Sequence, residues 1–207
     1  MSVNYDIQSE VIDIRNDSPR SNDKFFVDTN VWFWTTYQRA TQSPSPPSPY
    51  QTSDYPQYLD KALGINAQIL RFGLSFAELA NLIESTEYEI IYKPPLCLNR
   101  KEFRHNNRSY RGSVINEVES AWSQVIGMSS AIDLTIDDPK TDSALKFFKK
   151  HPIGGYDLFI LEAMKENKLV QIITDDGDFA CVPDIQVFTA NRNVIQSAKS
   201  QGKLVKR

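Results

Sequence analysis

The chain has 207 residues, 41% of them hydrophobic and 24% charged, with a formal net charge of −3 and an isoelectric point near 5.5. This composition supports one domain with a real core, and the mild acidity gives no general attraction for nucleic acid. A site for a polyanion therefore has to come from a local basic patch or a bound metal ion.

The first third of the chain predicts a polar extension followed by the first elements of a core. Residues 1–23 are polar and acidic, with at most one marginal strand. Phe25–Val27 predicts a short strand, and Val31–Tyr37 favours a helix. The segment 43–56 is rich in proline and serine and predicts an extended surface loop, with a proline-rich partner motif as the alternative. A helical pattern follows over 58–70.

Two further helices are predicted in the middle of the chain. The helix at 74–83 opens with Ser75 and Glu78 at the spacing of a capping box. Pro94-Pro95 closes that region. Residues 113–129 carry apolar side chains at helical spacing and predict the second of these helices.

The last part of the chain alternates strands and helices. We predict strands at 131–136, 168–174 and 185–189, and helices at 143–150 and 157–167. Such alternation is typical of an α/β fold with a mainly parallel central sheet and helices on both faces, a three-layer α/β/α sandwich.

Acidic residues fall where these predicted elements begin or end. Strand ends precede Asp28 and the run Asp175, Asp176 and Asp178, whereas Glu78 and Asp157 begin helices. Parallel strands present their carboxyl ends at one edge, where open α/β sheets bind ligands. Clustered carboxylates repel one another and attract a cation, and oxygen ligands without His or Cys suit Mg²⁺ or Mn²⁺.

Each acid also has a simpler interpretation. Glu78 can complete the capping box, and Asp157 can cap a helix and interact with its dipole. The turn Thr174–Phe179 can be an ordinary polar turn, since Asp and Gly dominate turns. The convergence of several segments on one edge favours the metal interpretation over each of these explanations.

At these residues the sequence resembles the PIN-domain ribonucleases, and among them the VapC-like toxins of type II toxin–antitoxin systems. The resemblance rests on FFVDTNVW, LSFAELANLI, GGYDLFILEAMKENKLVQIITDDGDF and VFTAN. It covers about residues 24–192, which we predict to be a PIN-like domain between an N-terminal extension (1–23) and a basic C-terminal tail (193–207).

The resemblance implies a metal-dependent endoribonuclease that uses Mg²⁺ or Mn²⁺. It assigns the catalytic and metal-binding roles to Asp28, Glu78, Asp157 and Asp176, with Asp178 as an auxiliary ligand and Asp175 as a competing choice for the fourth position. Asn30 and Thr174 would be polar supports. RNA is then the substrate and a cognate antitoxin protein a partner, and a homodimer is compatible with the resemblance.

Residues 99–111 form a basic stretch that is a candidate RNA contact. It contains Arg100, Lys101, Arg104, Arg108 and Arg111 together with two aromatic residues. A solvated loop or an antitoxin-facing surface is an equally good interpretation. The second basic cluster, at Lys199, Lys203, Lys206 and Arg207, predicts a frayed tail.

Two other classes of function compete with the nuclease. One is a non-catalytic PIN-like scaffold that binds RNA or a protein, although such a scaffold has no need of four acids. The other is a phosphatase with an aspartyl nucleophile, which requires a second Asp where this chain has Asn30.

Several features place the expected protein in the cytoplasm. No apolar run approaches the roughly 20 residues that span a bilayer. The N-terminus lacks the basic and then apolar pattern of a signal peptide. Cys97 and Cys181 show no metal or redox spacing, so we expect reduced thiols, and we expect surface roles for His105 and His151.

Overall fold

A computed structural model describes residues 3–91 and 99–207. In these residues one all-parallel sheet has the order β1–β6–β5–β2–β3–β4. The strands are β1 (Glu10–Asp13), β2 (Lys24–Val27), β3 (Gln68–Phe72), β4 (Ser130–Ile132), β5 (Gln171–Ile173) and β6 (Gln186–Thr189).

Side chains of the strands alternate between two buried faces. On the first face, Phe25 of β2, Ile173 of β5 and Phe188 of β6 belong to one apolar cluster. On the second face, Phe26 of β2 and Val187 of β6 belong to another. Burial on both sides is the usual arrangement of parallel sheets and explains why these strands read as nearly continuous apolar runs.

Helices cover both faces. The first face carries α1 (Thr29–Thr36), α2 (Pro49–Gly64), α3 (Leu74–Ile91) and α5 (Arg108–Met128). The second face carries α7 (Asp157–Glu166), with α6 (Asp138–Phe148) packed on it, and α8 (Arg192–Ser200) beside β1. The expected three-layer α/β/α sandwich with a parallel sheet is confirmed.

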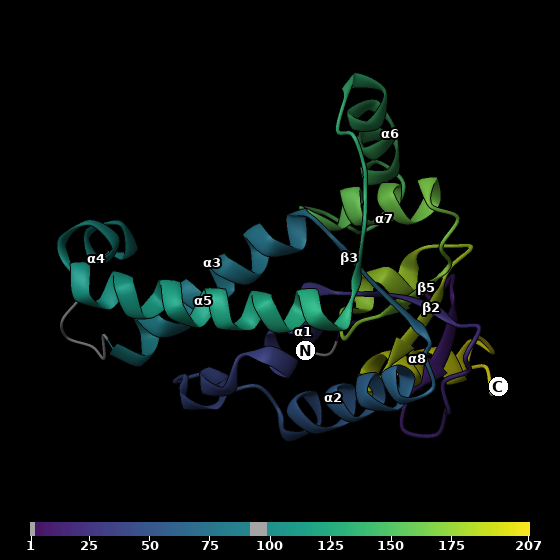
Figure 1. Ribbon diagram of the computed structural model, residues 1–207. Coiled ribbons are helices and arrows are strands. Elements are labelled where there is room, and N and C mark those ends of the chain that lie inside the picture. The colour runs from purple at the N-terminus through teal and green to yellow at the C-terminus, as the bar shows by residue number, and fades with distance from the viewer. Residues whose placement is uncertain (1–2, 92–98) are drawn as a thin grey trace.

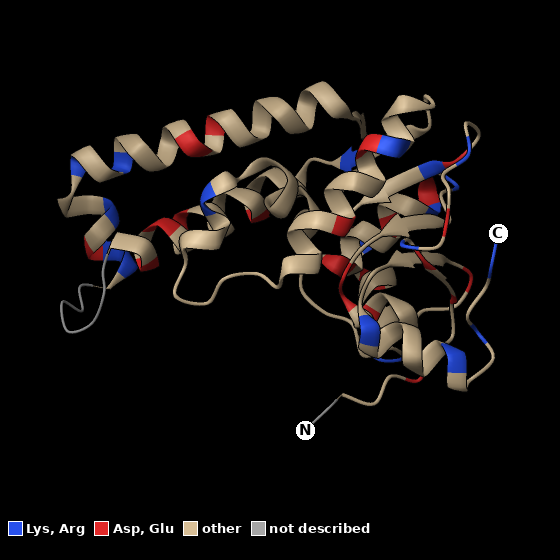
Figure 2. Ribbon diagram, turned by 90° about the horizontal axis from the view of Figure 1, so that it is seen from below, with Lys and Arg blue, Asp and Glu red and all other residues tan. Residues whose placement is uncertain are grey.

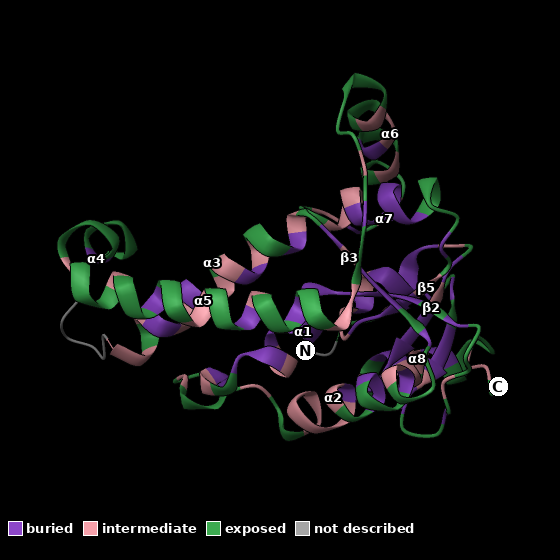
Figure 3. Cartoon of the chain, viewed as in Figure 1, coloured by how far each residue is buried: buried purple, intermediate pink, exposed green. Residues whose placement is uncertain are grey.

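Helices α3 and α5 form an arm that extends beyond the sheet. They pack against each other, and α4 (Arg100–Asn106) lies at their outer end (Figure 1). Figure 3 shows that α4 and α6 are largely exposed, whereas the strands are mostly buried. The molecule therefore has a compact sandwich and a projecting helical arm.

The proline-rich segment 43–56 is not wholly a loop, contrary to the prediction. Helix α2 begins at Pro49, whose missing N–H is not needed at the first helical position. The backbone N–H of Ser48 donates to Gln51 Oε1 (2.7 Å) and stabilises the start of the helix. Pro56 lies inside α2, where burial of neighbouring side chains offsets the one backbone hydrogen bond that it removes.

The predicted helix over 58–70 is wrong in its second half. Helix α2 ends at Gly64, and Asn66 then adopts a positive φ of 60° that ends the helical path. The apolar pair Ile69 and Leu70 belongs to strand β3. A leucine spacing that continued the helical pattern concealed this short strand.

The remaining predicted elements are present with shifted ends. The predictions at 113–129, 131–136, 143–150, 157–167, 168–174 and 185–189 correspond to α5, β4, α6, α7, β5 and β6. The basic stretch 99–111 is helical rather than a loop, because it contains α4 and the start of α5. Pro94-Pro95 and Cys97 lie outside the described residues, whereas Cys181 is a buried free thiol.

Both predicted appendages belong to the sandwich. Residues 1–23 contain β1, which pairs with β6 along its whole length. Residues 193–207 contain most of α8 and a segment that runs beside β1, where Val11 N–H donates to Lys203 O (3.0 Å) and Val205 N–H to Val11 O (2.8 Å). This pairing covers the exposed edge of the sheet. Hence neither segment lies outside the domain.

The side chain of Arg207 is largely covered rather than frayed, with 9% of it exposed. Its guanidinium pairs with Asp17 (2.7 Å) and Asp23 (2.8 Å) and lies over the ring of Phe188. Tyr58 Oη donates to the Asp17 carboxylate (2.5 Å). The end of the described chain is therefore fixed to the amino-terminal side of the sheet by charge and by packing.

Candidate functional site: an acidic cluster at the carboxyl edge of the sheet

The topology brings the ends of β2 and β5 together. These strands are neighbours, and β2 leads to β3 on its other side, so the strand order diverges between β2 and β5. Asp28 follows β2, and Thr174 follows β5. In open α/β sheets, such a divergence point leaves a crevice at the carboxyl edge where ligands bind.

Thr174 connects two of the acids. Asp28 is 2% exposed, and its Oδ2 accepts a hydrogen bond from Thr174 Oγ1 (2.7 Å). The backbone N–H of Asp176 in turn donates to Thr174 Oγ1 (2.9 Å). This chain of hydrogen bonds fixes the turn after β5 against the end of β2. Asn30, the other predicted support, is half-buried in the first turn of α1.

The carboxyl groups of Asp28 and Asp157 are electrostatically coupled. Burial is the main reason that the pKa of Asp28 rises to about 7, and the charges of Glu78 and Asp176 raise it further. Burial also raises the pKa of Asp157 to about 8, followed by repulsion from Asp28, Asp176 and Glu78. The pKa of Asp28 thus responds to two of the other predicted acids and that of Asp157 to three, and the four acids come from four separate segments.

Glu78 is available for a ligand because the expected capping box does not form. Helix α3 begins at Leu74, so Ser75 lies inside the first turn instead of preceding it. The buried Ser75 Oγ and the buried Glu78 Oε2 both lack a hydrogen-bond partner. Buried polar atoms are rarely left unpaired, so this oxygen is a candidate for an interaction with a bound group.

Asp175 differs from the other acids in its hydrogen bonds, although the charge of Asp176 still acts on it. Its carboxylate accepts from Tyr50 Oη (3.0 Å), Gln51 Nε2 (2.7 Å) and Tyr55 Oη (2.6 Å), all on α2. These three donors therefore hold the carboxylate that competed with Asp176 for the fourth position in the sequence analysis. We interpret Asp175 as the structural acid that attaches α2 to the end of β5.

Asp176 and Asp178 shape the acidic turn. Asp176 Oδ1 accepts from the backbone N–H of Asp178 (2.9 Å) and caps the short 3₁₀ helix η2 (Gly177–Cys181). Burial, followed by the charge of Asp176, raises the pKa of Asp178. Asp176 thus caps η2, with Asp178 next to it, and its role as the fourth acid stays a prediction.

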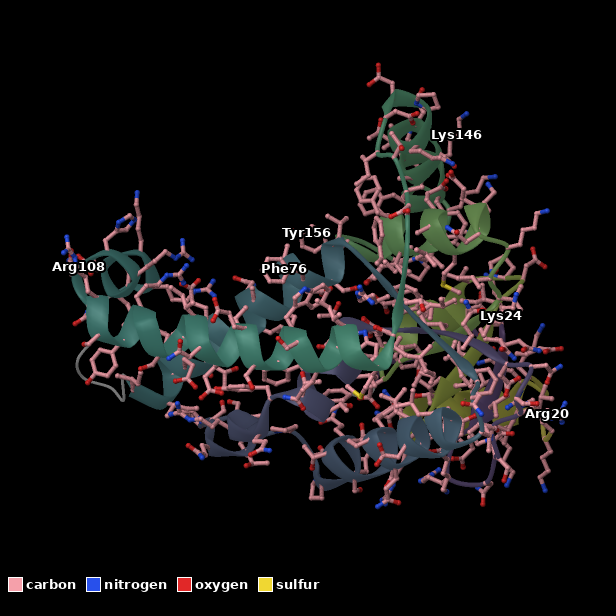
Figure 4. All side chains as sticks on the ribbon, in the orientation of Figure 1. Arg20, Lys24, Phe76, Arg108, Lys146 and Tyr156 are labelled. Atoms are coloured by element: carbon pink, nitrogen blue, oxygen red, sulfur yellow. The ribbon has the colours of Figure 1, made fainter. Side chains whose placement is uncertain are left out.

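The predicted basic residues do not join this cluster. They lie at the outer end of the arm, where Figure 2 shows Lys and Arg gathered and Figure 4 places Arg108. Arg104 and Arg111 both pair with the buried carboxylate of Glu84 in α3, the latter at 3.0 Å. These two arginines stabilise the arm, whereas Arg100, Lys101 and Arg108 are exposed. 

Exposed aromatic rings near the acids were not predicted as site residues. Phe76 precedes Glu78 by two residues and is 43% exposed, and its ring meets that of Trp122 edge to face. Tyr156 immediately precedes Asp157 and is 49% exposed. Figure 4 shows both side chains in the angle between the arm and α7. The only feature of the sequence that could have identified these two rings is their position close to an acid, and hydrophobic periodicity does not reveal it.

The ligand atoms of the acidic cluster are of the type that a hard divalent cation prefers. All the groups are carboxylate oxygens, which Mg²⁺ and Mn²⁺ prefer, and a nearby cation would relieve the repulsion that raises the pKa of Asp28 and of Asp157. Within residues 3–91 and 99–207, however, no three His, Cys, Asp or Glu side chains stand close enough together to hold an ion as they are placed. The fit thus rests on ligand chemistry and electrostatics.

Comparison with protein-family models and with curated proteins finds no match for this chain. In the described part of the chain, no helix combines the length and apolar character needed to span a lipid bilayer.

Proposed function

We propose that the protein is a metal-dependent endoribonuclease whose active site is the acidic cluster. The observation that carries the proposal is the coupling of Asp28 and Asp157 to each other, to Glu78 and to Asp176. Holding four like charges at one edge is unfavourable for folding, so a cation-dependent function gives the arrangement a physical reason.

The proposed roles follow from how each group is held. Asp28, buried and fixed by Thr174, would be a rigid ligand, and Asp157 and Asp176 would complete the binding of Mg²⁺ or Mn²⁺. Glu78, with its unpaired Oε2, would bind the ion or orient water. The ion, when bound, supplies water activation and offsets negative charge on the phosphate.

Two features support RNA as the substrate. Phe76 and Tyr156 offer exposed rings close in sequence to Glu78 and Asp157, and unpaired bases stack on such rings. Arg100, Lys101 and Arg108 give a local positive region at the outer end of the arm on an otherwise acidic chain. The resemblance of the acidic segments to PIN-domain ribonucleases points the same way, and it extends the proposal to a toxin with a cognate antitoxin and to a homodimer.

A non-catalytic scaffold is the second candidate. It is favoured by the fact that no three potential ligands among the described residues converge on one point. It predicts binding of RNA or of a protein without any dependence on a metal ion.

The test is cleavage of end-labelled RNA by the purified protein with Mn²⁺ or Mg²⁺, with EDTA as the metal-free condition. Asp28→Asn should lose cleavage, and the exposed Asp60→Asn in α2 serves as the matched control that retains it. Equal cleavage by wild type and Asp28→Asn would reject the assigned site. Metal-independent RNA binding without cleavage would support the scaffold.

A further inference from the structure

The N-terminal segment is clamped beside the acidic turn. Gln201 holds it twice, because Oε1 accepts from the backbone N–H of Ile7 (2.8 Å) and Nε2 donates to Tyr5 O (2.8 Å). The backbone N–H groups of Gln8 and Ser9 donate to Ala180 O in η2. Because these bonds join the segment to both α8 and η2, the position of Tyr5 is fixed from two sides.

The ring of Tyr5 lies directly on Gly177. A Cβ atom built on Gly177 would be 2.2 Å from Tyr5 Cζ and 2.7 Å from Tyr5 Oη, far inside van der Waals contact. The φ angle of Gly177 is not in the positive region, so glycine matters here for space rather than for conformation, and a Cβ would displace the Tyr5 ring. No other glycine in the described residues meets so close a neighbour.

Gly177 separates the two acids of the turn. Asp176 and Asp178 flank it, and the bond between the Asp178 N–H and Asp176 Oδ1 spans it. Tyr5 is also close enough for both carboxylates to raise its own pKa, after the larger effect of burial. The ring therefore covers the backbone of the turn and lies within electrostatic reach of the carboxylates on both sides.

We propose that Tyr5 is a positioning residue of the acidic site, whose ring packs on Gly177 and fixes the carboxylates of Asp176 and Asp178 for the divalent cation. The role belongs to the ring, since the Tyr5 hydroxyl makes no hydrogen bond to another residue in the described part of the chain. This inference rests on the metal site of the proposed function. It makes the segment before β1 a part of the active site.

The test uses Mn²⁺ alone as the probe, titrated into the full chain by calorimetry, with RNA cleavage as a second readout. Tyr5→Ala and Gly177→Ala should each weaken Mn²⁺ binding by about tenfold, as loss of groups that orient metal ligands usually does. Tyr5→Phe should bind as wild type does. Gly177→Ala should add no further loss in the Tyr5→Ala background, because the ring that it displaces is already absent.

Matched controls separate this effect from general damage. Gly127→Ala in α5 places a Cβ with no neighbour within 4 Å, and Tyr110→Ala removes an exposed ring at the arm. Both should leave Mn²⁺ binding unchanged, and urea unfolding should show that every variant is folded.

Each contrary result has a distinct meaning. Wild-type Mn²⁺ affinity in Tyr5→Ala, additive losses in the double variant, or a loss in Tyr5→Phe as large as in Tyr5→Ala would overturn the positioning role alone. Mn²⁺ binding by wild type without RNA cleavage would overturn the proposed ribonuclease function and leave the role of Tyr5 to be decided by affinity. Failure of wild type to bind Mn²⁺ would overturn both.

Discussion

Asp28→Asn should stabilise the metal-free protein even as it removes the proposed activity. The carboxyl of Asp28 is almost fully buried, and its pKa of about 7 stands against 3.8 for the ordinary side chain. Because the folded state retains a proton that the unfolded state releases, folding becomes less favourable as pH rises from about 4 to about 7. Asparagine keeps an acceptor for the hydroxyl of Thr174 and removes the charge.

The size of the effect follows from the pKa difference. A difference of about 3 pKa units corresponds to about 4 kcal/mol at pH 8, at about 1.4 kcal/mol per unit. The same two pKa values leave about 2 kcal/mol at pH 5 and less than about 1 kcal/mol at pH 4. The advantage of Asp28→Asn over wild type should therefore grow steadily with pH.

Urea unfolding in EDTA at pH 4, 5 and 8 measures this advantage, with the exposed Asp60→Asn as a control that should show none. Adding Mn²⁺ at pH 8 should reduce the advantage, since the ion stabilises only the protein that binds it. The reasoning is refuted if Asp28→Asn is no more stable than wild type at pH 8, or if its gain is the same at all three pH values.

Two predictions concern stability away from the site. Arg207→Met should lower the free energy of unfolding by about 3 kcal/mol or more, because it leaves the buried carboxylates of Asp17 and Asp23 without their cation; a loss below about 1 kcal/mol in urea unfolding would contradict the buried pairing. Pro56→Ala should raise the free energy of unfolding by about 1 to 3 kcal/mol, and the urea midpoint with it, because an N–H at position 56 can donate to the carbonyl of Thr52. A lower midpoint would show that the proline ring packs usefully in α2.

The sequence predicted those elements whose apolar pattern belongs to one kind of structure. Phe25–Val27 is a short apolar run before a polar break, and 113–129 has sustained helical spacing, so both were recognised. Strand β3 was missed because Leu70 continues a leucine spacing that began in α2. Strand β1 was undervalued because its short apolar stretch is set among acidic residues, and only pairing with β6 reveals its place in the sheet.

The order of the strands in the sheet could not be predicted from the sequence, for a different reason. Which strands are neighbours decides which acids meet, and strand order depends on packing between distant segments. The predicted convergence of Asp28 with Asp157 was therefore an inference from fold class, which the strand order and the shared rise in pKa now support. Tyr5 had no motif at all, since its signal is a contact with Gly177 across most of the chain.

The acids after β5 show most clearly what side-chain contacts add to a motif. In the sequence, Asp175, Asp176 and Asp178 are equivalent carboxylates in one polar turn, and spacing alone cannot rank them. The structure gives Asp175 three donors from α2, so this carboxylate already has the partners that a buried charge requires. Asp176 has its backbone tied to Thr174 and through it to Asp28, and its charge raises the pKa of Asp28 and of Asp157. The acid that accepts three hydrogen bonds from α2 is the structural one, and the acids whose charges act on Asp28 and Asp157 are the candidates for a metal ion.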